Sequence, residues 1–225
     1  MALNSAGQTV GDLLRTLVFG PDYGLYVQHH AVILSLRSGS LEMLERSKEG
    51  FRSVDRTRTR GRSALAFAAH PTERLLAYGD NYGEFHVQRY ETTGFGRARK
   101  IASKERKASR LEFIDSGRTL LIGGLGYLEA YSYDGARFVS KQALSVAVRD
   151  FICLPAIGMA LINHGLHGIS AYRYDGNEFS LVGSVRPGGA VDQLAVSGCG
   201  RYAAMTLQES ASIQIYRLGH GRIRA

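Results

Sequence analysis

Three acidic residues offer the clearest catalytic chemistry in this sequence. Glu112, Asp150 and Asp192 each lie within or beside an apolar run of the strand type. Two carboxylates on opposite sides of a glycosidic bond can act as general acid and general base. However, Arg110 and Arg149 lie beside Glu112 and Asp150 in the sequence and can form ion pairs with these acids. We therefore expect the three carboxylates to be solvated or ion-paired, with glycosidic-bond chemistry as the alternative.

The histidines and glycines do not indicate a metal or phosphate site. His164 and His167 are three residues apart, but no third ligand of suitable type is fixed near them in the sequence. The glycine-rich segment 123–126 joins two expected strands and precedes no helix, so it lacks the context of a phosphate-binding loop. We predict a tight turn there, and neither a metal nor a cofactor.

Positive charge is concentrated in two short segments. Residues 52–62 read RSVDRTRTRGR and residues 97–110 read RARKIASKERKASR, while the whole chain has a net charge of +8. Outside these segments the chain is slightly acidic, so the positive charge is local. The basic residues are Arg52, Arg56, Arg58, Arg60, Arg62, Arg97, Arg99, Lys100, Lys104, Arg106, Lys107 and Arg110.

Such segments attract anionic partners, which include acidic protein surfaces, nucleic acid and ribonucleoproteins. Solvated, mobile connections are the alternative interpretation. Only Phe51 and Phe95 flank the two segments, so stacking on single-stranded bases is weakly supported. Attraction to a nucleic-acid backbone is the most that this pattern indicates.

A repeat of about 44 residues fills the chain. Its copies align on the last large residue of a first apolar strand, which is Phe19, Phe67, Phe113, Phe151 or Val196. Each copy continues with a turn, two more apolar strands and a hairpin. Short β-branched and aromatic runs between Gly, Asp and Ser turns predict strands throughout. Asp134-Gly135 and Asp175-Gly176 predict tight hairpins, because Gly adopts the positive φ that these turns need.

Repeats of this length indicate the blades of a β-propeller, since a single four-stranded sheet cannot bury both faces alone. We predict an all-β chain of five blades with four antiparallel strands each, in one domain. The expected blades span approximately residues 11–50, 62–103, 108–145, 147–186 and 190–225. The last blade is completed by residues 221–225, by residues 3–10, or by pairing with a second protein.

The chain resembles the WD40-like and YVTN-like β-propeller repeat superfamily. The resemblance rests on the turns FIDSGR at Phe113 and VSGCGR at Val196, although the chain has no Trp and therefore no Trp-Asp dipeptide. It implies a scaffold that most often binds proteins, and it assigns no catalytic residue. Five-bladed glycosidase-like or sugar-binding propellers, with carboxylates on inner strands at the channel mouth, supply the alternative function.

In such a fold the two basic segments would be loops between blades, on adjacent blades and on one face. The function that we expect is a non-enzymatic interaction scaffold with a basic face. Cys153 and Cys199 lack the spacing of a disulfide framework, which favours a reducing, cytoplasmic setting. We also expect no signal peptide and no membrane-spanning segment.

Overall fold

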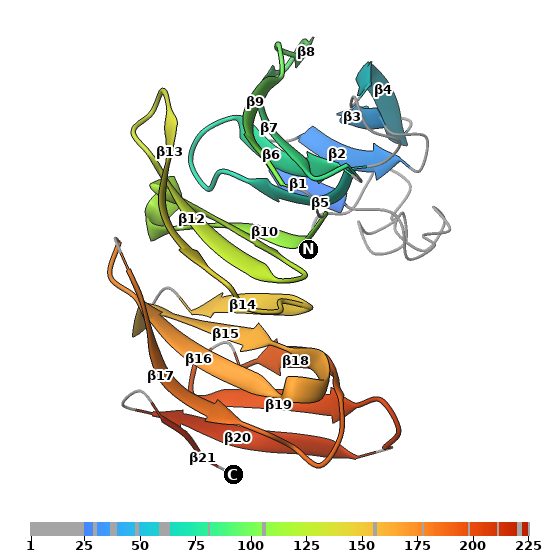
Figure 1. Ribbon diagram of the computed structural model, residues 1–225. Helices are drawn as coiled ribbons and strands as arrows, with labels where there is room; N and C mark the ends of the chain where they lie inside the picture. Colours follow the sequence, from blue (N-terminus) through green and yellow to red (C-terminus); the bar gives the residue numbers. More distant parts are fainter. Residues whose placement is uncertain are drawn as a thin grey trace. The chain divides into compact units, whose positions relative to one another are not determined.

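The structure is a computed structural model that describes residues 25–28, 31–36, 40–47, 50–58, 64–80, 82–104, 107–154, 157–176, 178–197, 199–210, 212–219 and 222–224. These residues form antiparallel strands and short 3₁₀ turns, with no α-helix among them (Figure 1). The all-β prediction is therefore confirmed. Within these ranges no helix is long and apolar enough to cross a membrane. The chain divides into two compact units, residues 1–107 and 108–225, which we describe separately.

The described residues of unit 1 form two sheets. The first has the strand order β1 (Leu25–Gln28), β2 (Ala31–Leu36), β3 (Ser40–Ser47) and β4 (Gly50–Arg58). The second contains β5 (Ala64–Ala69), β6 (Leu75–Asp80), β7 (Glu84–Glu91), β8 (Gly94–Phe95) and β9 (Arg99–Ser103). The two-residue strand β8 pairs with the end of β7, and β9 pairs with the beginning of β7. The second sheet thus also has four main strands, of which β9 is the outermost.

The two sheets of unit 1 share an apolar core and a partly buried hydrogen bond. Leu41 and Met43 of β3 pack in one cluster with Leu76 and Tyr78 of β6. At the edge of this cluster, the Phe95 backbone N–H donates a hydrogen bond to Asp55 Oδ2 at 2.8 Å. This bond attaches the β7–β8 hairpin to strand β4 of the neighbouring sheet.

The part of unit 2 that the structure describes forms three sheets, each of four strands in sequence order. They are β10 (Ala108–Ile114), β11 (Thr119–Gly124), β12 (Tyr127–Tyr133) and β13 (Phe138–Leu144); then β14 (Asp150–Leu154), β15 (Met159–Asn163), β16 (Ile169–Tyr174) and β17 (Phe179–Val185); then β18 (Val191–Val196), β19 (Tyr202–Leu207), β20 (Ile213–Gly219) and β21 (Arg222–Arg224). Strand β21 pairs with β20, so the end of the chain supplies an outer strand, as one of the predicted alternatives required.

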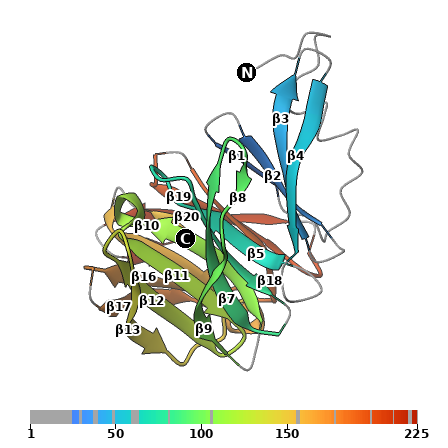
Figure 2. The same cartoon turned by 90° about the horizontal axis from the view of Figure 1, so that it is seen from above.

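The three sheets of unit 2 stack face to face through two apolar clusters. Phe151 and Ile162 of the second sheet pack on Leu121 and Leu128 of the first. Figures 1 and 2 show β12 and β13 beside β16 and β17 in this stack. The sheets approach closely at Gly123, where a Cβ atom would lie 2.8 Å from Val148 Cγ1 and 2.9 Å from the Phe151 ring. Gly123 therefore serves the packing of the two sheets, and the predicted tight turn is formed by residues 125 and 126 of the same segment.

Corresponding residues of the three sheets have different environments. Leu121 pairs with Ala130, Leu161 with Ala171, and Ala204 with Ile215, so the three pairs occupy the same place in successive sheets. The first two pairs are fully buried against the next sheet. Ile215 is 64% exposed. The last sheet of unit 2 thus presents an apolar face that no further sheet of this unit covers.

The structure corrects the prediction that residues 52–62 and 97–110 are loops between blades. Residues 52–58 belong to β4, residues 99–103 to β9 and residues 108–110 to β10. Consequently, the first sheet extends to Arg58 instead of ending near residue 50. The physical reason is that outer strands carry charged side chains, which protect an open sheet edge from pairing with other chains. A charged run is therefore compatible with a strand at this position.

Two isoleucines at corresponding positions of the second and third sheets test whether the apolar face of the last sheet is open to water. Ile169 is 1% exposed and Ile213 is 66% exposed. We expect Ile169→Ala to lower the free energy of unfolding by about 2–5 kcal/mol, because it leaves a cavity between two sheets. Ile213→Ala should change it by less than about 0.5 kcal/mol, because that side chain is already in water. Urea denaturation of both variants measures the difference. Equal losses would show that another sheet covers the last face.

Candidate functional site

The three predicted carboxylates lie on β10, β14 and β18, the first strands of the three sheets of unit 2, which we call the inner strands, and arginines contact all of them. Arg110 Nε lies 3.4 Å from Glu112 Oε2 on the same strand, and its Nη1 lies 3.3 Å from Asp150 Oδ1 on β14. Arg149 Nη2 donates a hydrogen bond to Asp192 Oδ1 of β18 at 3.0 Å. Ion pairing with Arg110 and Arg149 was one of the two expected states of these acids, and the structure shows it, although Arg149 contacts Asp192 and not the adjacent Asp150.

Two of these pairs connect neighbouring sheets. Arg110 of the first sheet contacts Asp150 of the second, and Arg149 just before the second contacts Asp192 of the third. The guanidinium carbon of Arg110 also lies 5.8 Å from the centre of the Phe151 ring, within the range of a cation–π contact. The positive charge of Arg110 is thus fixed between the carboxylates of Glu112 and Asp150.

Burial decides the protonation behaviour of Glu112. Loss of hydration raises the pKa of the Glu112 carboxyl, and the nearby Arg110 charge and a hydrogen bond with the Cys153 thiol offset only part of this rise. Burial and the Glu112 charge in turn raise the pKa of the Cys153 thiol well above its usual value. Cys153 is consequently an uncharged, buried thiol and a poor nucleophile.

This geometry is unfavourable for glycosidic-bond cleavage by the same carboxylates. General acid and general base must have the scissile bond between them. In unit 2 the Arg110 guanidinium lies between Glu112 and Asp150, so a substrate would have to displace it. The raised pKa of Glu112 is the one property that suits a general acid.

The histidine pair of the β15–β16 turn does not form a metal centre. His164 Nδ1 lies 2.6 Å from the Ala147 carbonyl oxygen, a hydrogen bond that attaches the turn to the segment before β14. His167 is exposed at the end of a short 3₁₀ turn. Neither residue belongs to a metal-ligand cluster among the described residues. The pair is part of the turn structure.

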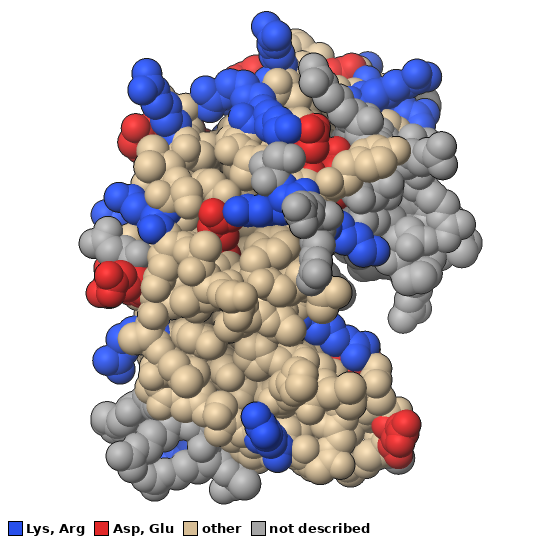
Figure 3. All heavy atoms as spheres, in the orientation of Figure 1, with Lys and Arg blue, Asp and Glu red and all other residues tan. Residues whose placement is uncertain are grey.

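The basic residues of the predicted face lie mainly in unit 1. Arg52, Arg56 and Arg58 are exposed along β4, and Arg97, Arg99 and Lys100 are exposed at β9 or just before it. Lys104 and Lys107 lie in the connection that follows β9, whereas Arg60, Arg62 and Arg106 lie outside the described residues. In Figure 3, Lys and Arg side chains gather over the part of the view that contains β4, β7, β8 and β9.

Several of these cations already contact an acid or a hydroxyl. Arg52 Nη2 lies 2.7 Å from Glu45 Oε2, and Lys100 Nζ lies 2.5 Å from Glu84 Oε1. Arg56 Nε donates a hydrogen bond to Ser40 Oγ at 3.0 Å. These contacts are at the surface, where an ion pair is worth roughly 0–1 kcal/mol, so a partner can exchange them at small cost. Arg110 differs, because its guanidinium is held between two acids in unit 2.

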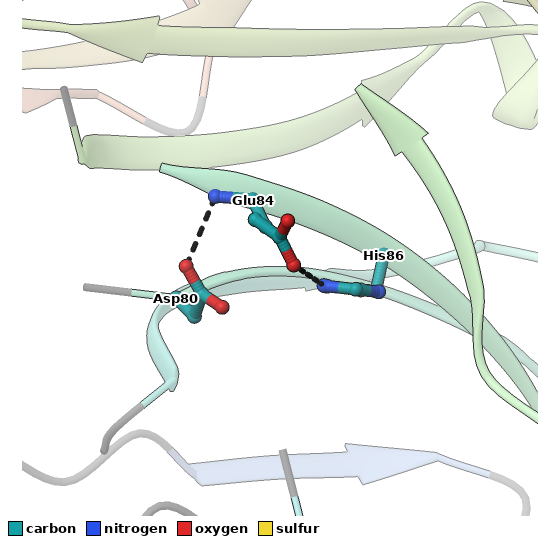
Figure 4. Close-up of side chains that lie close together, drawn as sticks. All are labelled: Asp80, Glu84 and His86. Atoms are coloured by element: carbon teal, nitrogen blue, oxygen red, sulfur yellow. Dashed lines mark hydrogen bonds and ion pairs between the residues drawn. The ribbon is translucent and has the colours of Figure 1, made fainter. Parts of the chain in front are cut away.

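One cluster in unit 1 has no counterpart among the sequence predictions. Asp80 ends β6, and Glu84 and His86 lie two residues apart at the start of β7 (Figure 4). One ligand atom from each residue lies within 4.8 Å of the others. The signal in the sequence was weak: a strand-ending Asp before a turn, followed by Glu and His on one face of a strand.

The structure of this chain is similar to those of known propeller proteins at low sequence identity. A provisionally named 6-phosphogluconolactonase of Bacteroides uniformis aligns with a TM-score of 0.72 and 16% identity, over 89% of this chain and 68% of that one. A protein of the same provisional name from Bacteroides fragilis gives 0.70 and 15%, over 88% and 67%. The β-propeller domain of Cps50 (Swd1) of Myceliophteria thermophila gives 0.69 and 13%, over 87% and 68%.

No family model matches the sequence, and no curated protein matches it either. The structural likeness therefore defines the fold alone. The chain has a β-propeller fold, as the resemblance of its repeats implied.

The raised pKa of Glu112 predicts a pH-dependent effect of Glu112→Gln. Because the folded protein binds this proton more tightly than the unfolded chain, the resulting stabilisation is present below the ordinary value of 4.5 and is lost as pH rises through the raised pKa. Glu112→Gln should therefore be more stable than the parent near neutral pH, and the difference should vanish below the ordinary value. Urea denaturation from acidic to neutral pH measures this difference.

The matched control for this series is Glu178→Gln, which changes an exposed carboxyl of the same unit. We expect Glu178→Gln to change the free energy of unfolding little at acidic pH and at neutral pH. A loss of stability in Glu112→Gln at neutral pH would mean that the attraction between Glu112 and Arg110 exceeds the cost of burying the carboxylate.

Proposed function

We propose that this chain is a non-enzymatic interaction scaffold that binds an anionic partner through the basic surface of unit 1. This basic surface comprises Arg52, Arg56, Arg58, Arg97, Arg99, Lys100, Lys104 and Lys107. The observation that carries the proposal is the exposure of basic side chains along β4 and β9, the outermost strands of two sheets. We also propose that the five sheets form one propeller domain.

The outer strands suit partner binding for two reasons. Side chains two residues apart on a strand point to the same face, so Arg56 and Arg58 place two positive charges together on one face of β4. The edge itself offers backbone groups to a partner, as in peptide recognition by strand addition. An acidic segment would thus meet both charge and backbone donors along one strand.

The partner can be an acidic protein surface, nucleic acid or a ribonucleoprotein. The β-propeller domain of Cps50 (Swd1) is a neighbour in structure. Protein binding is what the resemblance to WD40-like repeats implies, by analogy of fold only. Phe51 and Phe95 are half-buried, and Phe95 packs against the core of unit 1. They therefore offer little surface for stacking on bases, which favours the acidic protein.

The second candidate is a propeller enzyme or carbohydrate-binding protein that uses Glu112, Asp150 and Asp192. The raised pKa of Glu112 favours this function. The contacts of Arg110 and Arg149 with the same carboxylates argue against it. We therefore rank the interaction scaffold first.

A reducing, cytoplasmic setting is part of the proposal. Cys153 is a buried free thiol and Cys199 is an exposed free thiol. Exposed free thiols persist where the compartment keeps them reduced. This supports the cytoplasm over an oxidising environment.

Charge reversal tests the basic surface directly. Replacing Arg52, Arg58 and Arg97 by Glu should weaken binding to a fluorescent poly-glutamate or a homopolymeric RNA by about tenfold or more at low salt. The matched control replaces the exposed Arg137, Arg173 and Arg217 of unit 2 by Glu, which changes the net charge equally. Fluorescence anisotropy at several salt concentrations measures both variants.

Equal weakening by the two triple variants would mean that only net charge matters, and the proposed surface would be wrong. A pull-down with and without nuclease then separates the partner classes. Partners that survive nuclease and are lost from the unit 1 variant are acidic proteins, whereas partners lost with nuclease are bound through nucleic acid.

A further inference from the structure

The cluster of Asp80, Glu84 and His86 is built on rigid, paired strands. Strands β6 and β7 are adjacent, and Tyr78 and His86 are directly opposite each other in their register. The Tyr78 ring stacks on the His86 imidazole, with centroids 5.4 Å apart and an interplanar angle of 22°. Tyr78 therefore fixes the plane of the imidazole, and the hairpin fixes the positions of the two acids (Figure 4).

Asp80 supplies the observation that points to a ligand. The residue is only 1% exposed. Its Oδ1 accepts hydrogen bonds from the backbone N–H groups of Tyr82 and Glu84, each at 2.9 Å. Its Oδ2 is buried and has no hydrogen-bond partner among the described residues. A buried carboxylate oxygen without a donor is costly, and a bound cation would remove that cost.

The unsatisfied oxygen faces the other two residues. In Figure 4 the carboxylate of Asp80 directs one oxygen to the Glu84 backbone N–H and the other toward the side on which His86 lies. His86 Nε2 lies 3.5 Å from Glu84 Oε2. One oxygen from each acid and one imidazole nitrogen can thus converge on a common point.

The net charge of the cluster favours a divalent cation. Asp80 and Glu84 contribute two negative charges, and Lys100 contributes one positive charge through its contact with Glu84 Oε1. With a neutral imidazole the cluster is negative, and Oε2 of Glu84 remains on the side of His86. Lys100 can therefore stay in place while the opposite oxygen binds a metal ion.

We propose that Asp80, Glu84 and His86 bind a zinc ion. One imidazole nitrogen and two carboxylate oxygens form a common zinc ligand set, and the partly exposed side near Glu84 leaves the fourth position to water. Tetrahedral ligands at about 2.0–2.2 Å from zinc lie about 3.3–3.6 Å apart, so the three side chains must move inward by small rotations. The ion would tie the end of β6 to the start of β7 and stabilise unit 1.

Isothermal titration of the metal-free full chain with zinc chloride near neutral pH tests this site. We expect one zinc ion per chain, with a dissociation constant in the micromolar range or tighter, and about a 100-fold weaker constant for His86→Gln. The control is His167→Gln, which removes an exposed histidine of unit 2 and should leave the constant unchanged. Zinc should also raise the melting temperature of the parent and the control, but not that of His86→Gln.

His86 is buried, so its variant requires a second measurement. Circular dichroism without metal establishes whether His86→Gln is folded, and if it is not, Glu84→Gln at the partly exposed ligand decides the question. The proposal requires Glu84→Gln to weaken zinc binding by about tenfold or more. No stoichiometric zinc binding by the parent, or the same constant for a folded variant and the parent, would overturn it.

Discussion

The stacking of four-stranded sheets through their apolar faces is the constraint on which the rest of the structure depends. A lone sheet of this kind cannot exclude water from both of its faces, so each sheet needs a neighbour. In unit 2 this need is met at Ala130 and Ala171, which are fully buried against the next sheet, and is not met at the corresponding Ile215. The apolar contacts between neighbouring sheets therefore stabilise the fold as much as the contacts within each sheet do.

Stacking also determines what the inner strands can do. It brings Arg110 to 3.3 Å from Asp150 although the two residues are 40 positions apart, and it places Arg149 beside Asp192 of the third sheet. The carboxylates that could have served catalysis are instead ion-paired across neighbouring sheets. The basic side chains of the outer strands β4 and β9 lie at the surface, and the ion pairs of Arg52 with Glu45 and of Lys100 with Glu84 stay within one sheet. Such surface pairs are weak, and this difference supports the proposal of binding over catalysis.

Much of the fold could be predicted because the repeat encodes it locally. Phe67, Phe113 and Phe151 were expected to be the last large residues of first strands, and they do lie on β5, β10 and β14, the first strands of three sheets. The expected position within the strand was wrong for Phe151, which is the second residue of β14. Pairing of the acids with nearby arginines was also predictable. That Arg149 contacts Asp192 and not the adjacent Asp150 was not, because the choice depends on the distance between sheets.

Two features of the structure could not be predicted from the sequence, for physical reasons. Charged strands at a sheet edge have the composition of loops, so β4 and β9 were expected as connections. The convergence of Asp80 and His86 depends on the register of a hairpin, which spacing alone does not determine.

Hydrogen exchange of the chain, measured with and without a partner recovered in the pull-down, tests the central claim most directly. If the basic surface is the binding site, partner binding will slow exchange at the backbone amides of residues 50–58 and 94–104, and leave β10, β14 and β18 unchanged. Slower exchange confined to the strands that carry Glu112, Asp150 and Asp192 would contradict the account and support a ligand site at the inner strands instead.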